Sequence, residues 1–268
     1  MLNHETTGHV PNMKIHVLTT LAEIDDNFAV NRRSTSGENG PVVVIDVLRS
    51  SSSILNAFSN GCKEIIPVES VERALSLKSA LFESDLVLCG ERDGKKINGF
   101  ELGNSPYEYT REKIGNKSLI FTSTNGSVAL IKLKKCNAVH ICGFQNITEV
   151  GNLICTAENG TETEYGSIDI SCSGHKKNFA LEDVICAGML IDKVISRLSR
   201  DCDLSDSARS AYQLYEHNAD SLNTLLKEVD HGRELMDLGM EKDLDFCIQI
   251  DTIPLLPVYS DGKIKRAE

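Results

Sequence analysis

An apolar run that stops abruptly in charged and hydroxyl residues constrains the fold of this chain more than any other segment. Residues 42–47 are Val and Ile except for Asp46, and Leu48, Arg49 and four serines follow them. A strand that is buried on both faces of a parallel sheet has this continuous apolar character. Ligands of open α/β sheets bind beyond the carboxyl ends of such strands. The sequence therefore predicts that Asp46 and Arg49 lie at a binding site.

Two later segments repeat this order of strand, polar turn and helix. Residues 118–121 lead into the turn 122–127, and residues 168–171 lead into the turn 172–178, before a helix that begins at Leu181. Backbone N–H groups and hydroxyls in such turns bind phosphate, sulfate or carboxylate. Ser, Thr and Asn also cap helices and fill turns that bind nothing, so any one turn alone has a structural explanation. The three turns together favour a substrate with several negative groups.

Strand and helix patterns alternate from residue 42 to residue 199, which predicts an α/β fold: a three-layer α/β/α arrangement with a largely parallel or mixed sheet. We expect the first strand at residues 13–18, a flexible N-terminal extension at residues 1–12, and a functional domain at residues 13–268. This domain is either a single body or two lobes that meet near residues 159–166. In its last third, helices are expected at 206–218, 219–229 and 231–238, and closing strands at 244–250 and 253–258.

The composition limits the classes of partner. The 268 residues carry a formal net charge of −11, so nucleic acid and anionic membrane surfaces would repel the chain. No run approaches the roughly 18 apolar residues of a membrane-spanning helix. Nine cysteines are scattered without a Cys-x-x-Cys pair, which is typical of a protein in the reducing cytoplasm. A small anionic substrate is the expected partner, without nucleic acid or membrane, and a homo-oligomer is left open.

A second acidic and basic pair follows a later predicted strand. Glu91 and Arg92 come after residues 86–89, as Asp46 and Arg49 come after the earlier run. Carboxylates at strand ends beside hydroxyls suit Mg²⁺, which takes oxygen ligands and often bridges to a phosphate. Arginines supply planar donors for the remaining anionic oxygens. The alternative is that each acid pairs only with its own arginine as an internal salt bridge.

Common nucleotide and metal signatures are missing. The chain has no Gly-x-x-x-x-Gly-Lys-Ser/Thr motif and no zinc-ligand spacing, which disfavours a P-loop enzyme or a zinc site. His175 and His231 lie in polar segments and compete for a role at the site, since imidazole titrates near neutral pH. A histidine that packs at a helix end is the commoner situation.

These patterns define the predicted site. The candidate catalytic residues are Asp46, Arg49, Glu91 and Arg92, and the candidate Mg²⁺ ligands are Asp46, Glu91 and Asp183. The candidate substrate-binding residues are Ser50, Ser51, Ser52, Asn104, Ser105, Thr122, Thr124, Asn125, Gly126, Ser173, Gly174, His175, His231 and Arg233.

The ordered motifs resemble those of the 2-phosphosulfolactate phosphatase family. They are Asp-Val-Leu-Arg at 46–49, Gly-Glu-Arg at 90–92, Gly-Phe-Glu-Leu-Gly-Asn-Ser-Pro at 99–106, Thr-Ser-Thr-Asn-Gly at 122–126, Leu-Glu-Asp at 181–183 and His-Gly-Arg at 231–233. The resemblance implies a Mg²⁺-dependent hydrolase on an α/β fold that converts 2-phospho-3-sulfolactate to 3-sulfolactate, a step towards coenzyme M. Ser50–Ser53 and His175–Asn178 depart from the family pattern, which would have more Thr and Ala in the first turn and another glycine in the second.

The residues leave several readings open. A related phosphorylated 2-hydroxy acid could be the substrate, and either Asp46 or water could attack phosphorus. A phosphotransferase or lyase that acts on a similar polyanion, or a non-catalytic binding protein for an anionic metabolite, would use the same anion-binding turns.

Overall fold

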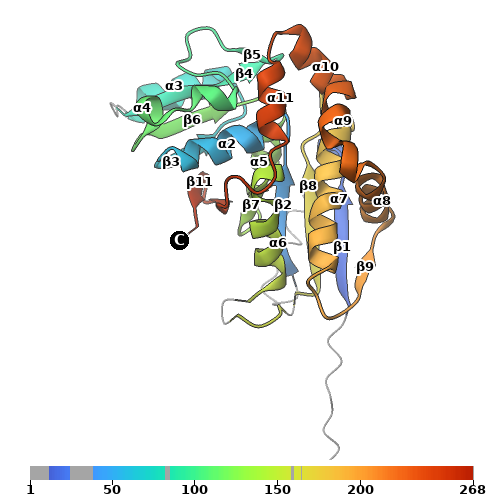
Figure 1. Cartoon of the computed structure of the whole chain (residues 1–268). Coiled ribbons are helices and arrows are strands. Elements are labelled where there is room, and N and C mark those ends of the chain that lie inside the picture. The colour runs from blue at the N-terminus through green and yellow to red at the C-terminus, as the bar shows by residue number, and fades with distance from the viewer. Residues whose placement is uncertain (1–11, 25–38, 82–84, 158–159, 164, 268) are drawn as a thin grey trace, which may run out of the picture.

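One mixed sheet of eleven strands organises the part of the chain that the computed structural model describes, namely residues 12–24, 39–81, 85–157, 160–163 and 165–267 (Figure 1). The order across the sheet is β5-β4-β6-β3-β11-β10-β7-β2-β8-β1-β9. The strands are β1 (Met13–Leu18), β2 (Asn39–Ile45), β3 (Glu64–Pro67), β4 (Leu86–Arg92), β5 (Lys95–Lys96), β6 (Ser118–Thr122), β7 (Val139–Cys142), β8 (Ser167–Cys172), β9 (Cys202–Leu204), β10 (Pro257–Ser260) and β11 (Lys263–Arg266). The predicted α/β class with a mixed sheet is confirmed.

Two groups of parallel strands make up most of this sheet. Strands β7, β2, β8, β1 and β9 form one group, and β3, β6 and β4 form the other. The hairpin of β10 and β11 joins them, because β10 pairs antiparallel with β7 and β11 pairs antiparallel with β3. In Figure 1, β1, β2 and β8 stand upright while β3 and β6 lie across them.

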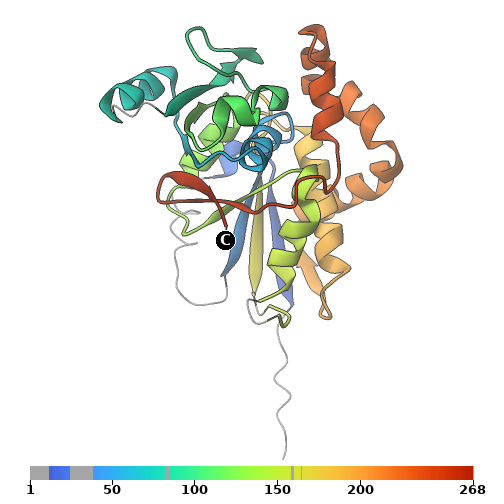
Figure 2. The same ribbon diagram turned by 60° about the vertical axis from the view of Figure 1, so that its left-hand side comes forward.

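Helices cover both faces of the first group of strands. Val43 and Ile45 pack into a core that includes side chains of α6 (Ile147–Cys155), α7 (Leu181–Ile195) and α8 (Asp206–Asn218). Val42 and Val44 alternate to the opposite face, as successive side chains of a strand do. That second core holds side chains of α2 (Ser50–Ser59), α5 (Gly126–Lys132) and both strand groups. It is therefore a core that the two strand groups share. Figure 2 shows the same ribbon in a turned view.

A third, smaller core lies on the far side of the second strand group. It gathers Leu86, Leu88 and Ile120 with Ala74 of α3 (Val71–Leu81). The short helix α4 (Arg111–Ile114) precedes β6. Helices α9 (Leu222–Glu228), α10 (Asp230–Asp237) and α11 (Glu241–Cys247) follow α8. In Figure 1, α10 lies at the top of the molecule and α11 lies next to it.

Two sequence predictions for the last third need correction. The strand expected at 244–250 is wrong, because residues 241–247 form α11. Leu244 and Cys247, three residues apart, are buried on one face of that helix, whereas the alternation of Leu244 and Phe246 suggested a strand. The strand expected at 253–258 begins only at Pro257, and its partner β11 was not predicted.

The segment 159–166, the candidate boundary between lobes, connects α6 to β8 within the first strand group, and residues 159 and 164 lie outside the described residues. Residues 1–11 of the expected N-terminal extension also lie outside them. The division of domains stays a prediction. None of the described helices is both long and apolar enough to cross a membrane.

Candidate active site

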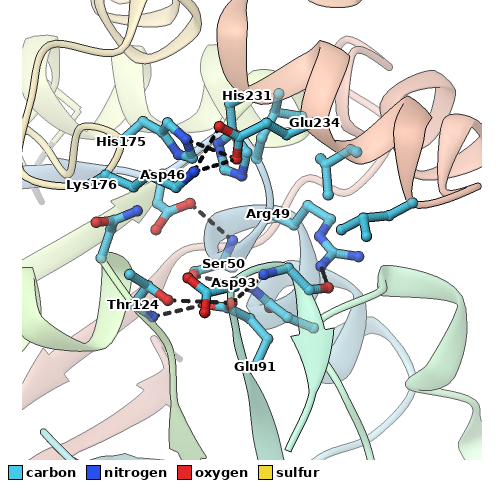
Figure 3. A pocket seen from close by; sticks show the side chains of 16 residues that line it. Asp46, Arg49, Ser50, Glu91, Asp93, Thr124, His175, Lys176, His231 and Glu234 are labelled. Atoms are coloured by element: carbon cyan, nitrogen blue, oxygen red, sulfur yellow. Dashed lines mark hydrogen bonds and ion pairs between the residues drawn. The ribbon is translucent and has the colours of Figure 1, made fainter.

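A cavity lies where the ends of β2, β4, β6 and β8 approach helix α10 (Figure 3). The space between its walls, together with the solvent at its mouth, has a volume of about 470 Å³. Its walls are formed by Asp46, Leu48, Arg49, Ser50, Glu91, Asp93, Gly94, Asn104, Thr124, Asn125, His175, Lys176, His231, Glu234, Leu235 and Leu238. Nine of the residues predicted for the site are among them.

Asp46 presents a desolvated carboxylate to this cavity from the turn between β2 and α2. Its Oδ1 accepts a hydrogen bond of 3.1 Å from the backbone N–H of Ser50. Burial raises the pKa of Asp46 to about 6, although the Ser50 hydrogen bonds and the charge of His231 act in the opposite direction. The ionised form of Asp46 is therefore destabilised by desolvation, and a nearby cation would stabilise it.

Glu91, at the end of β4, places a second buried carboxylate on the wall of the same cavity. Its Oε1 accepts from the backbone N–H of Thr124 at 2.7 Å, and its Oε2 accepts from the N–H of Gly94 at 2.9 Å. These bonds attach the turn after β6 to the end of β4. The structure thus brings Asp46 and Glu91 together, although they belong to different strand groups.

The two predicted arginines make contacts that differ from the expected ones. Arg49 is buried and donates through Nη1 to Asp243 of α11 at 2.5 Å and through Nη2 to the carbonyl of Gly94 at 2.7 Å. Arg92 donates to the carbonyl of Glu91 and to Oγ1 of Thr122. Among the described residues, neither acid of the predicted pairs forms a salt bridge with its own arginine. Arg49 reaches the cavity wall, and Arg92 does not.

Some of the predicted hydroxyl residues line the cavity, and others form hydrogen bonds within the protein behind it. Ser50 and Thr124 line the cavity, whereas Thr122 is fully buried in β6. Oγ of Ser51 accepts from the N–H of Asp46. Ser52 donates to the carbonyl of Val47 and accepts from Gln145, and Ser105 donates to Asp243. The supporting hydroxyls therefore hold the turns that carry Asp46 and Arg49.

The turn after β6 contributes the amide side chain of Asn125 and the backbone of Gly126, which lies close to Asp46 and Ser50. Asn125 lines the cavity beside Asn104, whose buried Oδ1 has no hydrogen-bond partner among the described residues. A Cβ atom added to Gly126 would lie 2.5 Å from Oδ2 of Asp46 and 2.6 Å from Oγ of Ser50. Only glycine permits this contact without displacement of the Asp46 carboxylate.

Asp183 lies behind the cavity wall and connects two of the polar turns. Its Oδ1 accepts from the N–H of Val47 at 2.8 Å, and its Oδ2 accepts from the N–H of Gly174 at 3.0 Å. Burial, together with the neighbouring Glu182 and Asp46 charges, raises the pKa of Asp183 well above its ordinary value. Asp183 is not among the residues that line the cavity, and its two backbone hydrogen bonds join the turns after β2 and β8. Ser173 and Gly174 also lie outside the cavity lining.

Two stacked imidazoles form the opposite wall. The ring centroids of His175 and His231 are 4.1 Å apart, and the ring planes are inclined by 26°. Nε2 of His175 lies 3.2 Å from Glu234, which also pairs with Lys176, and Nδ1 of His231 lies 3.3 Å from Glu182. Figure 3 shows the histidines and Glu234 above Asp46, with Glu91 and Thr124 below it.

Helix α10 and the residue after it supply part of the wall that the sequence did not predict. His231, Glu234, Leu235 and Leu238 are spaced by three or four residues, so one face of the helix and the residue after it meets the cavity. That periodicity could have identified Glu234. Arg233, which was predicted to bind substrate, points away from this face, is exposed and pairs with Asp230. Asp93 and Asp243 carried no comparable sequence signal.

Comparison with known proteins identifies the family. The family described as 2-phosphosulpholactate phosphatase matches residues 29–262. The chain belongs to this family. A probable 2-phosphosulfolactate phosphatase of Caldanaerobacter subterraneus is 34% identical over 240 residues, which cover 90% of this chain and 95% of the relative. Proteins with the same name from Clostridium beijerinckii and Thermotoga petrophila are 32% and 36% identical, over 94% and 82% of this chain and 99% and 89% of the relatives.

The side chains of this family member fit a hard cation better than a softer metal. Among the described residues, no three His, Cys, Asp or Glu side chains gather in a metal-binding cluster. The cavity instead offers the carboxylates of Asp46 and Glu91 and the unpartnered amide oxygen of Asn104. Mg²⁺ is commonly held by one or two carboxylates, waters and substrate phosphate, and it takes oxygen ligands. This set of oxygen donors fits Mg²⁺.

Proposed function

We propose that this chain is a Mg²⁺-dependent phosphatase that hydrolyses 2-phosphosulfolactate, or a related phosphorylated 2-hydroxy acid, to the free hydroxy acid and phosphate. The observation that carries the proposal is the meeting of Asp46 and Glu91, both buried, on the walls of one cavity in a member of the 2-phosphosulfolactate phosphatase family. Two carboxylates without an ion pair to their own arginines leave a negative site that a divalent cation would neutralise.

Asp46 and Glu91 would hold Mg²⁺, with Asn104 as a further oxygen donor. When bound, Mg²⁺ would neutralise phosphoryl oxygens and draw the phosphate towards the two carboxylates. Asp46, which has one oxygen engaged by Ser50 and the other beside Gly126, would either attack phosphorus or orient the attacking water. Glu91 would keep Thr124 and Gly94 in place through its hydrogen bonds.

The remaining charges of the cavity suit the acidic groups of the substrate. Arg49 is fixed in orientation by Asp243 and Gly94, so its remaining N–H groups would present a rigid donor to a phosphoryl oxygen. Lys176 and His175 at the opposite wall share the partly exposed carboxylate of Glu234. An anionic substrate would compete with Glu234 for the ammonium group of Lys176 and the imidazole of His175. Ser50, Thr124 and Asn125 would complete the anion-binding wall.

Phosphate release from synthetic 2-phosphosulfolactate by the purified chain tests this proposal. We expect release that depends on Mg²⁺, stops with a chelator, and is lost in Asp46→Asn while the variant stays folded. Stoichiometric formation of 3-sulfolactate and inorganic phosphate would exclude a phosphotransferase or lyase. Ligand-dependent thermal stabilisation without phosphate release would instead indicate a binding protein and would refute the proposal.

A further inference from the structure

His231, at the start of α10, contacts the buried carboxylate of Glu182, which has no role in the proposed binding of metal or phosphate. Glu182 lies in the first turn of α7, and its side chain is only 3% exposed. Its Oε1 lies 3.3 Å from Nδ1 of His231, which is 14% exposed and lines the cavity. A carboxylate at one ring nitrogen fixes the orientation of an imidazole, so that the other nitrogen can donate to a ligand.

His175, the other ring of the stack, contacts a more exposed carboxylate than His231 does. Glu234, which lies beside His175, is 45% exposed and shares its charge with Lys176. Burial and the neighbouring His231 both lower the pKa of His175. Two imidazolium rings 4.1 Å apart would repel one another, so the stack favours a single charge. Glu182 is the more buried of the two carboxylates, so it holds the ring of His231 more firmly than Glu234 holds the ring of His175.

The other titratable groups on the cavity wall are less suited to donate a proton. Both oxygens of Glu91 accept backbone N–H groups. Lys176 and Glu234 are about half exposed and are paired with each other. Asp46 is already assigned, with Glu91, to holding the metal and the phosphate. His231 is the remaining group on the wall, and the buried Glu182 holds its ring in a fixed orientation.

The charge distribution places the ester oxygen of a substrate towards His231. A phosphate held at Asp46 and Glu91 leaves the acidic remainder of the molecule to point away from these carboxylates, towards His175, Lys176 and His231. The ester oxygen joins the phosphorus to that remainder and therefore faces the histidine wall. An alkoxide leaving group is strongly basic, and its departure needs a proton.

We propose that His231 is the general acid of this phosphatase and that Glu182 is the residue that positions it; the inference rests on the proposed function. The bond between phosphorus and the ester oxygen breaks, its electron pair stays on that oxygen, and the oxygen takes the proton of His231 Nε2. Attack on phosphorus forms the new P–O bond, and water supplies the oxygen of the released phosphate. One proton of that water goes to solvent, from which His231 is protonated again. The net change is ester plus water to alcohol plus phosphate.

Two esters with different leaving groups test the assignment. Phosphate release from 2-phosphosulfolactate, which expels an alkoxide, is compared with release from 4-nitrophenyl phosphate, whose phenolate leaves without a proton. His231→Asn retains an N–H that can reach Glu182. We expect it to lower kcat for 2-phosphosulfolactate by on the order of 10²-fold to 10⁴-fold, the usual contribution of general acid catalysis, and to affect the aryl ester far less. Glu182→Gln should show a smaller loss with the same dependence on the leaving group.

Matched variants separate this role from structural damage. Glu64→Gln removes a half-buried carboxylate that pairs with Lys263 away from the cavity, and both activities should stay at the wild-type level. His175→Asn, in the same stack, should change KM and reduce turnover of both esters by a similar factor. An equal loss on both esters in His231→Asn, or no loss on either, overturns the inference while the phosphatase assignment stands. Wild-type protein that releases phosphate from neither ester overturns the proposed function and this inference with it.

Discussion

Replacement of Asp46 with asparagine should stabilise the metal-free protein at neutral pH, although it removes a residue of the proposed active site. Burial raises the pKa of Asp46 from 3.8 to about 6, because the ionised form loses hydration. This pKa difference of about 2 corresponds to about 3 kcal/mol between the two protonation states. Asparagine keeps the oxygen that accepts from Ser50 and carries no charge.

The sign of the pH dependence follows from linkage. The folded state binds the Asp46 proton more tightly than the unfolded state, so this stability contribution is present below pH 4 and is lost as the pH rises through about 6. The stability of the wild type should therefore fall over this range relative to that of the variant. At pH 8 the advantage of Asp46→Asn should exceed its value at pH 4 by about 2 to 3 kcal/mol.

Urea unfolding of both proteins with a chelator present, at pH 4 and at pH 8, measures this difference. Comparison of the two pH values cancels any packing effect of the substitution that does not depend on charge. If the difference in unfolding free energy between variant and wild type is the same at both pH values, the claim that burial raises the pKa of Asp46 is refuted. Ser210→Ala, which removes a hydroxyl that donates to the backbone carbonyl of Asp206 in α8, serves as a variant without such pH dependence.

Three further predictions address other parts of the site. Gly126→Ala should reduce phosphate release severely with little change in the circular dichroism spectrum, because the added Cβ displaces Asp46 and Ser50; normal kcat/KM would contradict the close contact. Asp243→Asn should destabilise the fold by about 3 to 5 kcal/mol in denaturant unfolding, since it leaves the buried Arg49 without its counter-ion, and a loss below about 1 kcal/mol would show that the pair is unimportant. Mg²⁺ should raise the Tm of the wild type but not of Asp46→Asn combined with Glu91→Gln, as scanning calorimetry would show; equal Tm increases would place the metal elsewhere.

The sequence predicts the strand ends that carry the site because each strand and the polar turn after it are visible in consecutive residues. The Val- and Ile-rich run before Asp46 is typical of a buried strand, and the change to polar residues marks its carboxyl end. The same reasoning located Glu91, Thr124 and His175. The structure adds that these ends come from two strand groups joined by the hairpin of β10 and β11. No local pattern shows that the last strands of the chain are inserted between earlier ones.

Contacts between distant segments account for what the sequence did not predict. Arg49 has its partner in Asp243, 194 residues later, and the region of that partner looked like a strand. Nothing in the sequence shows that Asp183 lies outside the cavity lining and accepts the backbone N–H groups of Val47 and Gly174. By contrast, the Asp261-Gly262 turn, with positive φ at both residues, is a hairpin signal that the sequence does contain. Attention to it would have predicted β11.

The central claim is that Asp46 and Glu91 act together on one magnesium-bound phosphate ester. The most direct measurement is the rate of phosphate release from 2-phosphosulfolactate as Mg²⁺ is titrated into the wild type, Asp46→Asn and Glu91→Gln. The account predicts saturable activation by Mg²⁺ in the wild type and a loss of activity in both variants that added Mg²⁺ does not restore. Wild-type turnover that is unaffected by Mg²⁺ and chelator, or variants with full activity, would contradict it.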